Sequence, residues 1–201
     1  MTASGIAART ATHAELEVVT GLCLEAFADE AVAAWIIPDP AERQRNLREM
    51  FSASLETVIE AGAMILAIDP GGTPIATSIW LPRDAASEPT EPEPSVVEDG
   101  SQARRMRAVE TATQARRPQG SYLHLSSMAT LPDHRGRGAG SAMLHAGLER
   151  SRTLDLPVYL EASTSDNRRL YARSGFHDLG EPIHLPEGGP SLQPMWAETA
   201  R

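Results

Sequence analysis

The spacing of apolar residues predicts three helices in the first third of the chain. Thr12 and Glu15 form a capping-box pair at the start of the first helix, whose apolar residues recur every three or four positions. The second helix is short and ends at Pro38, and the third ends at Gly62. One face of the third helix is apolar and carries Leu47, Met50, Phe51, Leu55, Val58 and Ile59.

Short apolar segments separated by turn residues predict strands in the rest of the chain. Strands are expected at 6–9, 63–68, 74–81, 122–131, 158–162, 176–180 and near 193–197, and further helices at 101–117, 138–152 and 167–173. This alternation is typical of an α/β layer on one mixed sheet, here of about six or seven strands. We therefore expect a single domain over residues 1–201.

Residues 82–100 differ from the rest of the chain in composition. Prolines stand at 82, 89, 92 and 94, and carboxylates at 84, 88, 91, 93, 98 and 99. Such a segment cannot bury much apolar surface. It is predicted to be an acidic, Pro-rich loop in solvent.

Composition and charge argue against several classes of partner. Hydrophobic residues make up 41% of the 201 residues and charged residues 22%, as in an ordinary soluble protein. No apolar run is long enough to span a membrane, and the N-terminus lacks the pattern of a secretory signal. The net charge of −9 argues against nucleic acid as a partner. We expect a cytoplasmic protein.

The reactive residue types narrow the chemistry further. All 18 basic residues are arginines, which excludes a Schiff-base lysine and leaves arginine and backbone amides to hold any phosphate. The single cysteine, Cys23, lies among apolar residues and is expected to be a buried structural thiol. The histidines show no spacing with Cys, Asp or Glu that is typical of a metal site, so we expect no metal.

The most informative segment joins a predicted strand to the helix that starts at Gly138. It contains Pro132 and Arg135 and three glycines, at 136, 138 and 140. Free amides at a helix N-terminus and missing side chains together suit a diphosphate, although a turn without ligand would have the same glycines. A Walker loop needs a lysine, and a dinucleotide fingerprint expects an early βαβ unit with an acid about 20 residues on. Both fit poorly.

Two motifs resemble those of the GNAT (Gcn5-related) acyltransferases. Arg135-x-x-Gly138-x-Gly140 is similar to the acyl-CoA motif of that family. The segment from Asn167 to Phe176, which ends in Leu-Tyr-x-x-x-Gly-Phe, is similar to its second motif, in the same order and spacing. The resemblance is specific over residues 122–180 and weaker in the rest of the chain. Several features, among them the first helix and the short gap from Asn167 to Tyr171, resemble puromycin N-acetyltransferase-like members of the family.

This resemblance implies a fold and a cofactor site. The expected fold is a central mixed, mostly antiparallel sheet that is splayed between two parallel strands, at 122–131 and 158–162, and flanked by helices. Acetyl-CoA would enter the gap as acyl donor. The implied cofactor-binding residues are Met128, Ala129, Thr130, Arg135, Gly136, Arg137, Gly138, Ala139, Gly140, Ser141 and Asn167. Asn167 could also cap its helix.

The resemblance also implies candidate catalytic residues. Tyr171 matches the family's tyrosine near the CoA sulfur and would protonate the leaving thiolate, although its ring could also simply pack against Phe176. Glu161 is the first candidate for the base, directly or through a water, and His124 on the adjoining strand is its rival. Either side chain could instead have a structural role, as an ion pair for Glu161 and as a half-buried imidazole for His124.

The resulting prediction is transfer of an acetyl group from acetyl-CoA to a primary amine of a small molecule. The donor could instead be a longer acyl-CoA or a carrier-protein thioester. A second alternative is that the protein is not an enzyme and binds acyl-CoA without catalysis. The negative surface suits cationic amines. The sequence does not identify the acceptor, and it is compatible with a homodimer.

Overall fold

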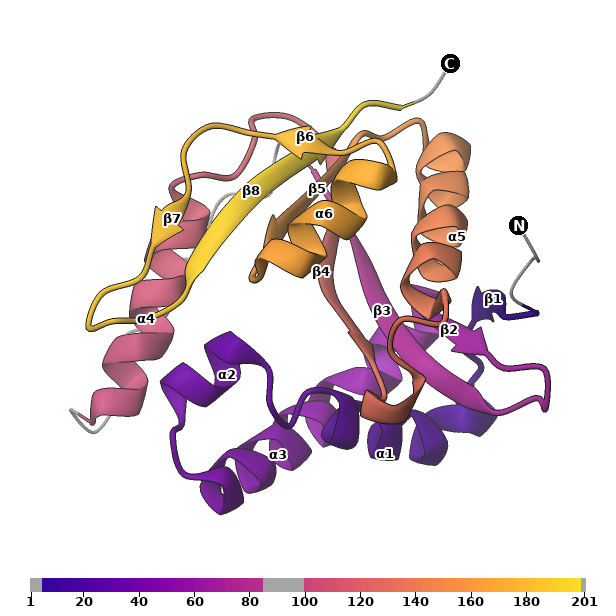
Figure 1. Ribbon diagram of the computed structural model, residues 1–201, viewed down its shortest axis with the longest axis horizontal. Coiled ribbons are helices and arrows are strands. Elements are labelled where there is room, and N and C mark those ends of the chain that lie inside the picture. The colour runs from indigo at the N-terminus through magenta and orange to yellow at the C-terminus, as the bar shows by residue number, and fades with distance from the viewer. Residues whose placement is uncertain (1–4, 85–99, 200–201) are drawn as a thin grey trace.

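The computed structural model of the chain describes residues 5–84 and 100–199. A sheet forms its centre, with helices on both faces (Figure 1). The strands are β1 (Ala7–Thr10), β2 (Met64–Ile68), β3 (Pro74–Arg83), β4 (Tyr122–Thr130), β5 (Val158–Ala162), β6 (His177–Asp178), β7 (Ile183–His184) and β8 (Ser191–Ala197). The helices are α1 (Leu16–Ala26), α2 (Ala31–Ile36), α3 (Pro40–Glu60), α4 (Ser101–Gln114), α5 (Ala139–Leu154) and α6 (Ser165–Arg173), with short 3-10 turns η1 (His13–Glu15) and η2 (Pro132–His134).

The sheet has the order β1-β2-β3-β4-β5-β8-β6, and β7 also pairs with β8. Every pair is antiparallel except β4 and β5, which are parallel. These two strands pair only at Leu123↔Val158 and His124↔Tyr159. Beyond that point they diverge, while β4 remains paired with β3 as far as Thr130. The predicted mixed, mostly antiparallel and splayed sheet is confirmed.

Helices α5 and α6 cover one face of the sheet, which we call the α5 face. Its core contains alternate residues of β5, namely Val158, Leu160 and Ala162. Helix α5 lies against β3 at Gly147, where an added Cβ would be 2.0 Å from the ring of Trp80. Trp80 is fully buried there, so it belongs to the core.

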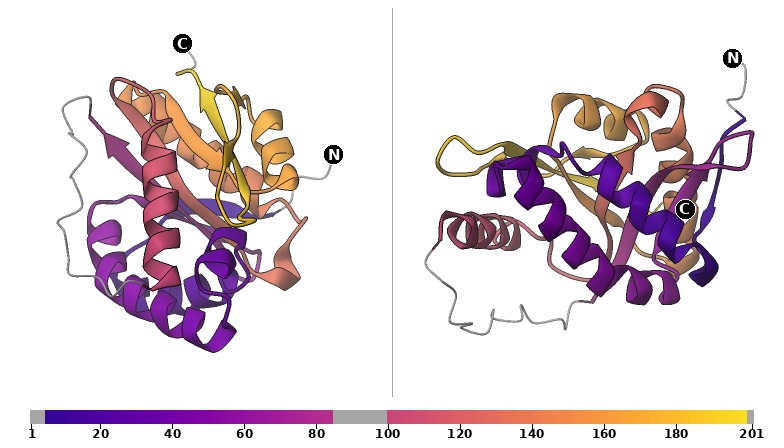
Figure 2. Two further views of the ribbon diagram at one scale, coloured as in Figure 1. Left: turned by 90° about the vertical axis from the view of Figure 1, so that its left-hand side faces the viewer. Right: turned by 90° about the horizontal axis from the view of Figure 1, so that it is seen from below.

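Helices α1 and α3 cover the opposite face along β2, where Phe27, Phe51 and Leu55 pack on Met64 and Leu66. Further along the chain, α2 and α4 pack against the β7–β8 hairpin through an apolar cluster that includes Val32, Trp35 and Val109. Figure 2 shows α4 standing beside the sheet, away from α5. Four helices therefore pack along the opposite face, two at the β2 end and two at the β7–β8 hairpin.

The observed elements depart from the expected ones in a few places. Strand β3 continues through Pro82 and Arg83 because both pair with β4, so the predicted loop at 82–100 begins later. Residues 85–99 of that loop lie outside the described part of the chain. Strand β7 was not expected, because two residues carry no recognisable pattern. In the described part of the chain, no helix is long and apolar enough to cross a membrane.

Candidate active site

A cleft of about 640 Å³ lies where β4 and β5 diverge. Its walls come from the end of β4, the loop before α5, the start of α6 and the α1–α2 connection. The backbone of residues 125–130 has no strand partner on the β5 side. Unpaired peptide groups of this kind are available to a ligand that is itself rich in amides. The volume is in the range of ordinary small-molecule sites.

The Arg/Gly loop forms one end of the cleft, and its three glycines serve different purposes. Gly136 and Gly138 have φ of +72° and +100°, a backbone region that other residues rarely adopt. Gly140 has ordinary helical geometry, but an added Cβ would be 2.9 Å from Leu170 on α6. The first two glycines therefore shape the loop, and the third lets α5 and α6 approach each other.

Helix α5 begins at this loop without a side-chain cap. Gly138 is its N-cap and offers no side chain to the free amides, so the first N–H groups of the helix stay available. Arg135 Nε donates to Thr130 O at 3.3 Å, which holds the loop against the end of β4. The cleft contacts all the predicted cofactor-binding residues except Arg137. An anion at this end would meet amides, the positive helix end and Arg135.

Helix α6 forms the facing wall, and one detail corrects the sequence-based expectation. The helix begins at Ser165, and Thr164 is its N-cap, whose Oγ1 accepts from Asn167 N at 3.1 Å. Asn167 therefore does not cap the helix, because the chain supplies a better-placed threonine three residues earlier. The side chain of Asn167 is left free to face the cleft that it lines.

The α1–α2 connection brings two acids, Asp29 and Glu30, into the wall of the cleft. Glu30 caps α2 by accepting from Ala33 N at 2.9 Å. Arg43, buried in α3, holds the connection by donating to the carbonyl oxygens of Ala28 and Ile37, both at 2.7 Å. Sequence reasoning did not identify these residues as part of a site.

A signal for Arg43 was nevertheless present in the sequence. It occupies the position four residues before Leu47, in line with the buried stripe of α3. A charged residue on an apolar stripe is rarely buried unless it has fixed partners. An arginine at this position therefore indicates a buried cation that is hydrogen-bonded to a neighbouring segment.

Tyr171 lies on α6 in the core of the α5 face, outside the residues that line the cleft. Its ring packs on Phe176 with centroids 5.9 Å apart, which is the structural contact that the sequence allowed for. Its hydroxyl makes no hydrogen bond to a described residue. Burial raises the pKa of Tyr171 to about 12, so the phenol stays protonated at neutral pH.

The two rival bases lie together on the opposite face of the sheet. His124 Nε2 and Glu161 Oε2 are 3.0 Å apart, and both side chains are nearly buried. The second nitrogen of His124 and the second carboxylate oxygen of Glu161 have no partner among the described residues. Neither side chain lines the cleft. The structure therefore makes them a pair, although the sequence presented them as alternatives.

Comparison with known proteins identifies the family. Residues 24–176 match the acetyltransferase (GNAT) family. This protein belongs to the GNAT family. A histone acetyltransferase HPA2-related acetyltransferase from Corynebacterium glutamicum is 26% identical, with a TM-score of 0.72 and 98% of each chain covered.

Two more distant structures share the fold of this GNAT protein. Arylalkylamine N-acetyltransferase 2 of Aedes aegypti is 13% identical, with a TM-score of 0.72 over 97% of this chain and 99% of the other. The PaiA N-acetyltransferase of Thermoplasma acidophilum, whose structure contains coenzyme A, is 12% identical, with a TM-score of 0.61 over 96% and 98%. The likeness covers nearly the whole of each chain.

Aromatic rings surround the His124–Glu161 pair of the GNAT protein. Tyr159 lies beside His124 across the parallel pair, with ring centroids 5.6 Å apart, and Tyr122 packs edge-on against Tyr159 at 5.5 Å. Trp196 completes the group on β8. Burial raises the pKa of Tyr159, and the nearby charge of Glu161 adds to that rise. The hydroxyl of Tyr159 lies near Glu161 but does not meet the geometry of a hydrogen bond to it.

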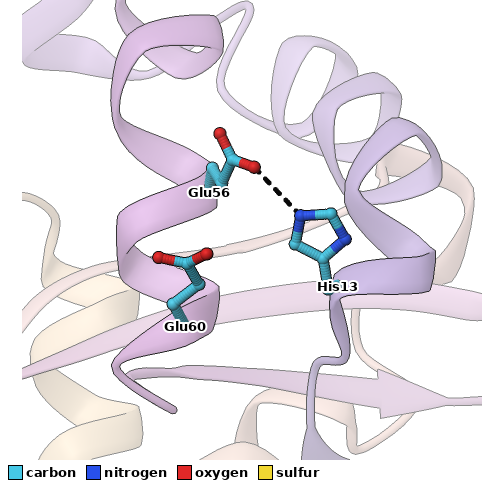
Figure 3. Close-up of side chains that lie close together, drawn as sticks. All are labelled: His13, Glu56 and Glu60. Carbon is cyan, nitrogen blue, oxygen red and sulfur yellow. Dashed lines mark hydrogen bonds and ion pairs between the residues drawn. The ribbon is translucent and has the colours of Figure 1, made fainter.

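Two other groups of side chains lie apart from this site. Cys23 is buried, and burial raises the pKa of its thiol to about 12, as expected for a structural cysteine. His13, Glu56 and Glu60 meet on the surface, where one ligand atom from each lies within 4.8 Å of the others (Figure 3). The fold assembles this group from two helical segments, so spacing along the sequence could not reveal it. His13 Nε2 and Glu56 Oε1 are 2.9 Å apart, as in a surface ion pair.

Proposed function

We propose that this protein transfers an acetyl group from acetyl-CoA to a primary amine of a small molecule. The observation that carries the proposal is the cleft between β4 and β5, which has unpaired strand backbone at one end and the uncapped start of α5 at the other. An acyl-CoA has a matching order of groups, with pantetheine amides next to a diphosphate. The amine acceptors of GNAT relatives such as arylalkylamine N-acetyltransferase add support.

The backbone of the cleft would do most of the donor binding. Peptide groups of Met128 and Thr130 would pair with the pantetheine amides, and the amides from Arg135 to Ser141 would hold the diphosphate. Bound acetyl-CoA supplies a thioester, whose carbonyl oxygen gains negative charge when an amine attacks. A backbone N–H near Met128 or Ala129 would stabilise that charge.

The catalytic groups would act from the two faces of the sheet. Tyr171, which is protonated at neutral pH, would give its proton to the departing sulfur from the α5 face. The Glu161–His124 pair would take a proton from the incoming amine on the opposite face, directly or through a water. Hydrogen bonding fixes the imidazole relative to the carboxylate, so the two groups would work as one unit.

Binding of CoA tests the donor part of the proposal. CoA at about 100 times its dissociation constant should stabilise the protein by about 2.7 kcal/mol, seen as a higher Tm. Gly138→Asp should remove this effect, because its carboxylate would stand beside the diphosphate. Gly138→Asn is the matched control, since it imposes the same backbone strain at φ +100° without the charge. The donor site is wrong if CoA leaves the wild-type Tm unchanged, or if both variants lose CoA equally.

Thiol release separates the enzyme from its alternatives. A panel of primary amines with acetyl-CoA should give amide and free CoA, whereas a binding module would give none with any amine. Longer acyl-CoA donors should react more slowly than acetyl-CoA. A preference for a longer acyl chain or for a carrier-protein thioester would keep the fold and the acid–base roles but change the donor.

Several further assignments belong to the same proposal. We place the chain near puromycin N-acetyltransferase-like members of GNAT, on the strength of the first helix and the short gap from Asn167 to Tyr171. We also propose one domain, a cytoplasmic location and no resident metal. Phylogenetic placement, limited proteolysis, cell fractionation and metal analysis of the purified protein test these in turn.

A further inference from the structure

Two arginines influence Tyr122 at the edge of the His124–Glu161 region, one from the opposite face of the sheet and one from the connection between α4 and β4. Arg83 is paired with Tyr122 across β3 and β4, and directly opposed residues of antiparallel strands point to the same face. Tyr122 in turn packs against His124 and Tyr159. Arg83 therefore belongs to the same face as the proposed base. Arg117 lies in the segment that leads from α4 into β4.

Both arginines act on the same tyrosine. Burial raises the pKa of Tyr122, and the guanidinium groups of Arg117 and Arg83 oppose that rise. Arg117 has the same influence on Tyr159. Two positive charges are thus gathered around one buried phenol, at the end of the face that lies beyond His124.

Neither guanidinium has a partner in the described part of the chain. The Nε of Arg83 and the Nε of Arg117 are buried without a hydrogen-bond acceptor, and both side chains are half-buried. By contrast, Arg43 and Arg105 donate to backbone carbonyl groups. Partly desolvated cations without acceptors are costly unless an anion joins them. A carboxylate satisfies two such groups at once, because guanidinium forks bind carboxylate oxygens in pairs.

One end of this face is therefore suited to an amine and the other end to an anion. Glu161 and His124 form the end where an amine would lose its proton, and Arg83 and Arg117 form the end that lacks an anion. His124 and Tyr122 are two residues apart in one strand, or about 7 Å. This spacing is comparable to the distance between the amino and carboxyl groups of a small acceptor that carries both.

This inference rests on the proposed function. We propose that the acceptor is an amine that also carries a carboxylate, and that Arg83 and Arg117 bind this carboxylate beside Tyr122. The pair would then select amino-acid-like acceptors over the same amines without the carboxyl group. It would also orient the amino group toward Glu161.

Matched acceptor pairs test this inference. The probes are L-tryptophan with tryptamine, L-tyrosine with tyramine, and L-arginine with agmatine, each measured by thiol release from acetyl-CoA. For at least one pair, kcat/KM should be tenfold or more higher for the member with the carboxylate. Arg83→Met and Arg117→Met should each reduce that preference at least tenfold, mainly through KM, and leave the rate with the decarboxylated amine within threefold. Arg117→Lys should retain part of the preference, since it keeps the charge but not the fork.

Three controls make the result decisive. Arg107→Met removes an exposed arginine of α4 and should leave the preference unchanged. CoA should stabilise every variant as it does the wild type, which excludes misfolding and keeps the donor test separate. The triple variant Glu88→Gln, Glu91→Gln and Glu93→Gln should also keep the preference. If it shifts the preference tenfold, the arginines hold carboxylates of the chain itself and the inference is wrong.

Two other results would overturn the inference. One is that no pair shows a tenfold preference for the member with the carboxylate. The other is an unchanged preference in both methionine variants. If acetyl-CoA is not turned over with any probe, binding of the three amino acids to the CoA-loaded protein decides instead. The inference then fails if none binds, or if the methionine variants bind as well as the wild type. In contrast, loss of CoA binding by the wild type would refute the proposed function itself.

Discussion

The two sides of the gap between β4 and β5 are built in different ways. On the donor side, most of residues 128–141 line the cleft with their glycines and backbone amides, together with the start of α6 and the α1–α2 connection. On the opposite face, ionisable and aromatic side chains from β3, β4, β5 and β8 meet through strand pairing. The donor side is open to a ligand, whereas His124 and Tyr159 are buried.

This difference teaches how one fold can keep a donor and change an acceptor. In the proposed function, backbone groups would bind the donor whatever side chains surround them, so substitutions elsewhere would leave that function intact. The opposite face depends on which side chains the strand register places side by side, and a single substitution there changes the chemistry. The division would be wrong if a substitution of a side chain on the opposite face abolished CoA binding.

The largest expected effect is that of Tyr171→Phe. We expect kcat to fall by about 10- to 1000-fold while the dissociation constant for CoA changes little, because the hydroxyl meets the sulfur only as it becomes a thiolate. The ring would still pack on Phe176, so the Tm should be nearly unchanged. Steady-state kinetics and CoA titration measure both quantities. A variant with wild-type kcat would remove Tyr171 from the mechanism and leave the family assignment untouched.

The donor side was largely predictable because its signals are local in the sequence. The strand, the Arg/Gly loop and the start of α5 follow one another between residues 122 and 141, and each has a recognisable pattern. The splay between β4 and β5 was expected from the resemblance to GNAT proteins and is confirmed by the two register pairs at its base. Even there, the packing role of Gly140 against Leu170 required the structure.

The opposite face was only partly predictable: the sequence named His124 and Glu161 on adjoining strands, but the contacts of this face join residues far apart in the chain. His124 and Glu161 are 37 residues apart, and only the parallel register makes them a hydrogen-bonded pair. The wall formed by Asp29 and Glu30 depends on Arg43, whose acceptors are carbonyl oxygens that no side-chain pattern reports. Strand β7 was missed for a simpler reason, since two residues are too few to show a period.

Glu161→Gln probes the opposite face and should have an intermediate effect. We expect kcat/KM to fall about tenfold or more at low pH and much less at high pH, where more of the amine is already neutral. Glutamine keeps the shape and can still bond to His124, so the CoA-induced rise in Tm should persist. The measurement is a pH profile of kcat/KM for both proteins.

His124→Asn sharpens this test, because it removes the imidazole and keeps a polar group. A large loss in His124→Asn with full activity in Glu161→Gln would make His124 the base. Full activity in both variants on a genuine acceptor would move the proton transfer to bound water or to the acids of the cleft wall, Asp29 and Glu30.

The smallest expected effect concerns His13, which lies outside both regions. The hydrogen bond to Glu56 raises the pKa of His13, and the charges of Glu56 and Glu60 add to it (Figure 3). Because the pKa of His13 is higher in the folded state, its pairing with Glu56 stabilises the folded protein. This contribution is complete below the ordinary histidine pKa near 6.5 and is lost as pH rises through the folded-state pKa. Titration of the His13 ring by NMR should give a pKa above 6.5 that falls toward it with added salt. Glu56→Gln should lower this pKa more than Glu60→Gln, since only Glu56 bonds the ring. Equal effects of the two variants would show that charge alone acts here, and a pKa at or below 6.5 in the wild type would contradict the pairing.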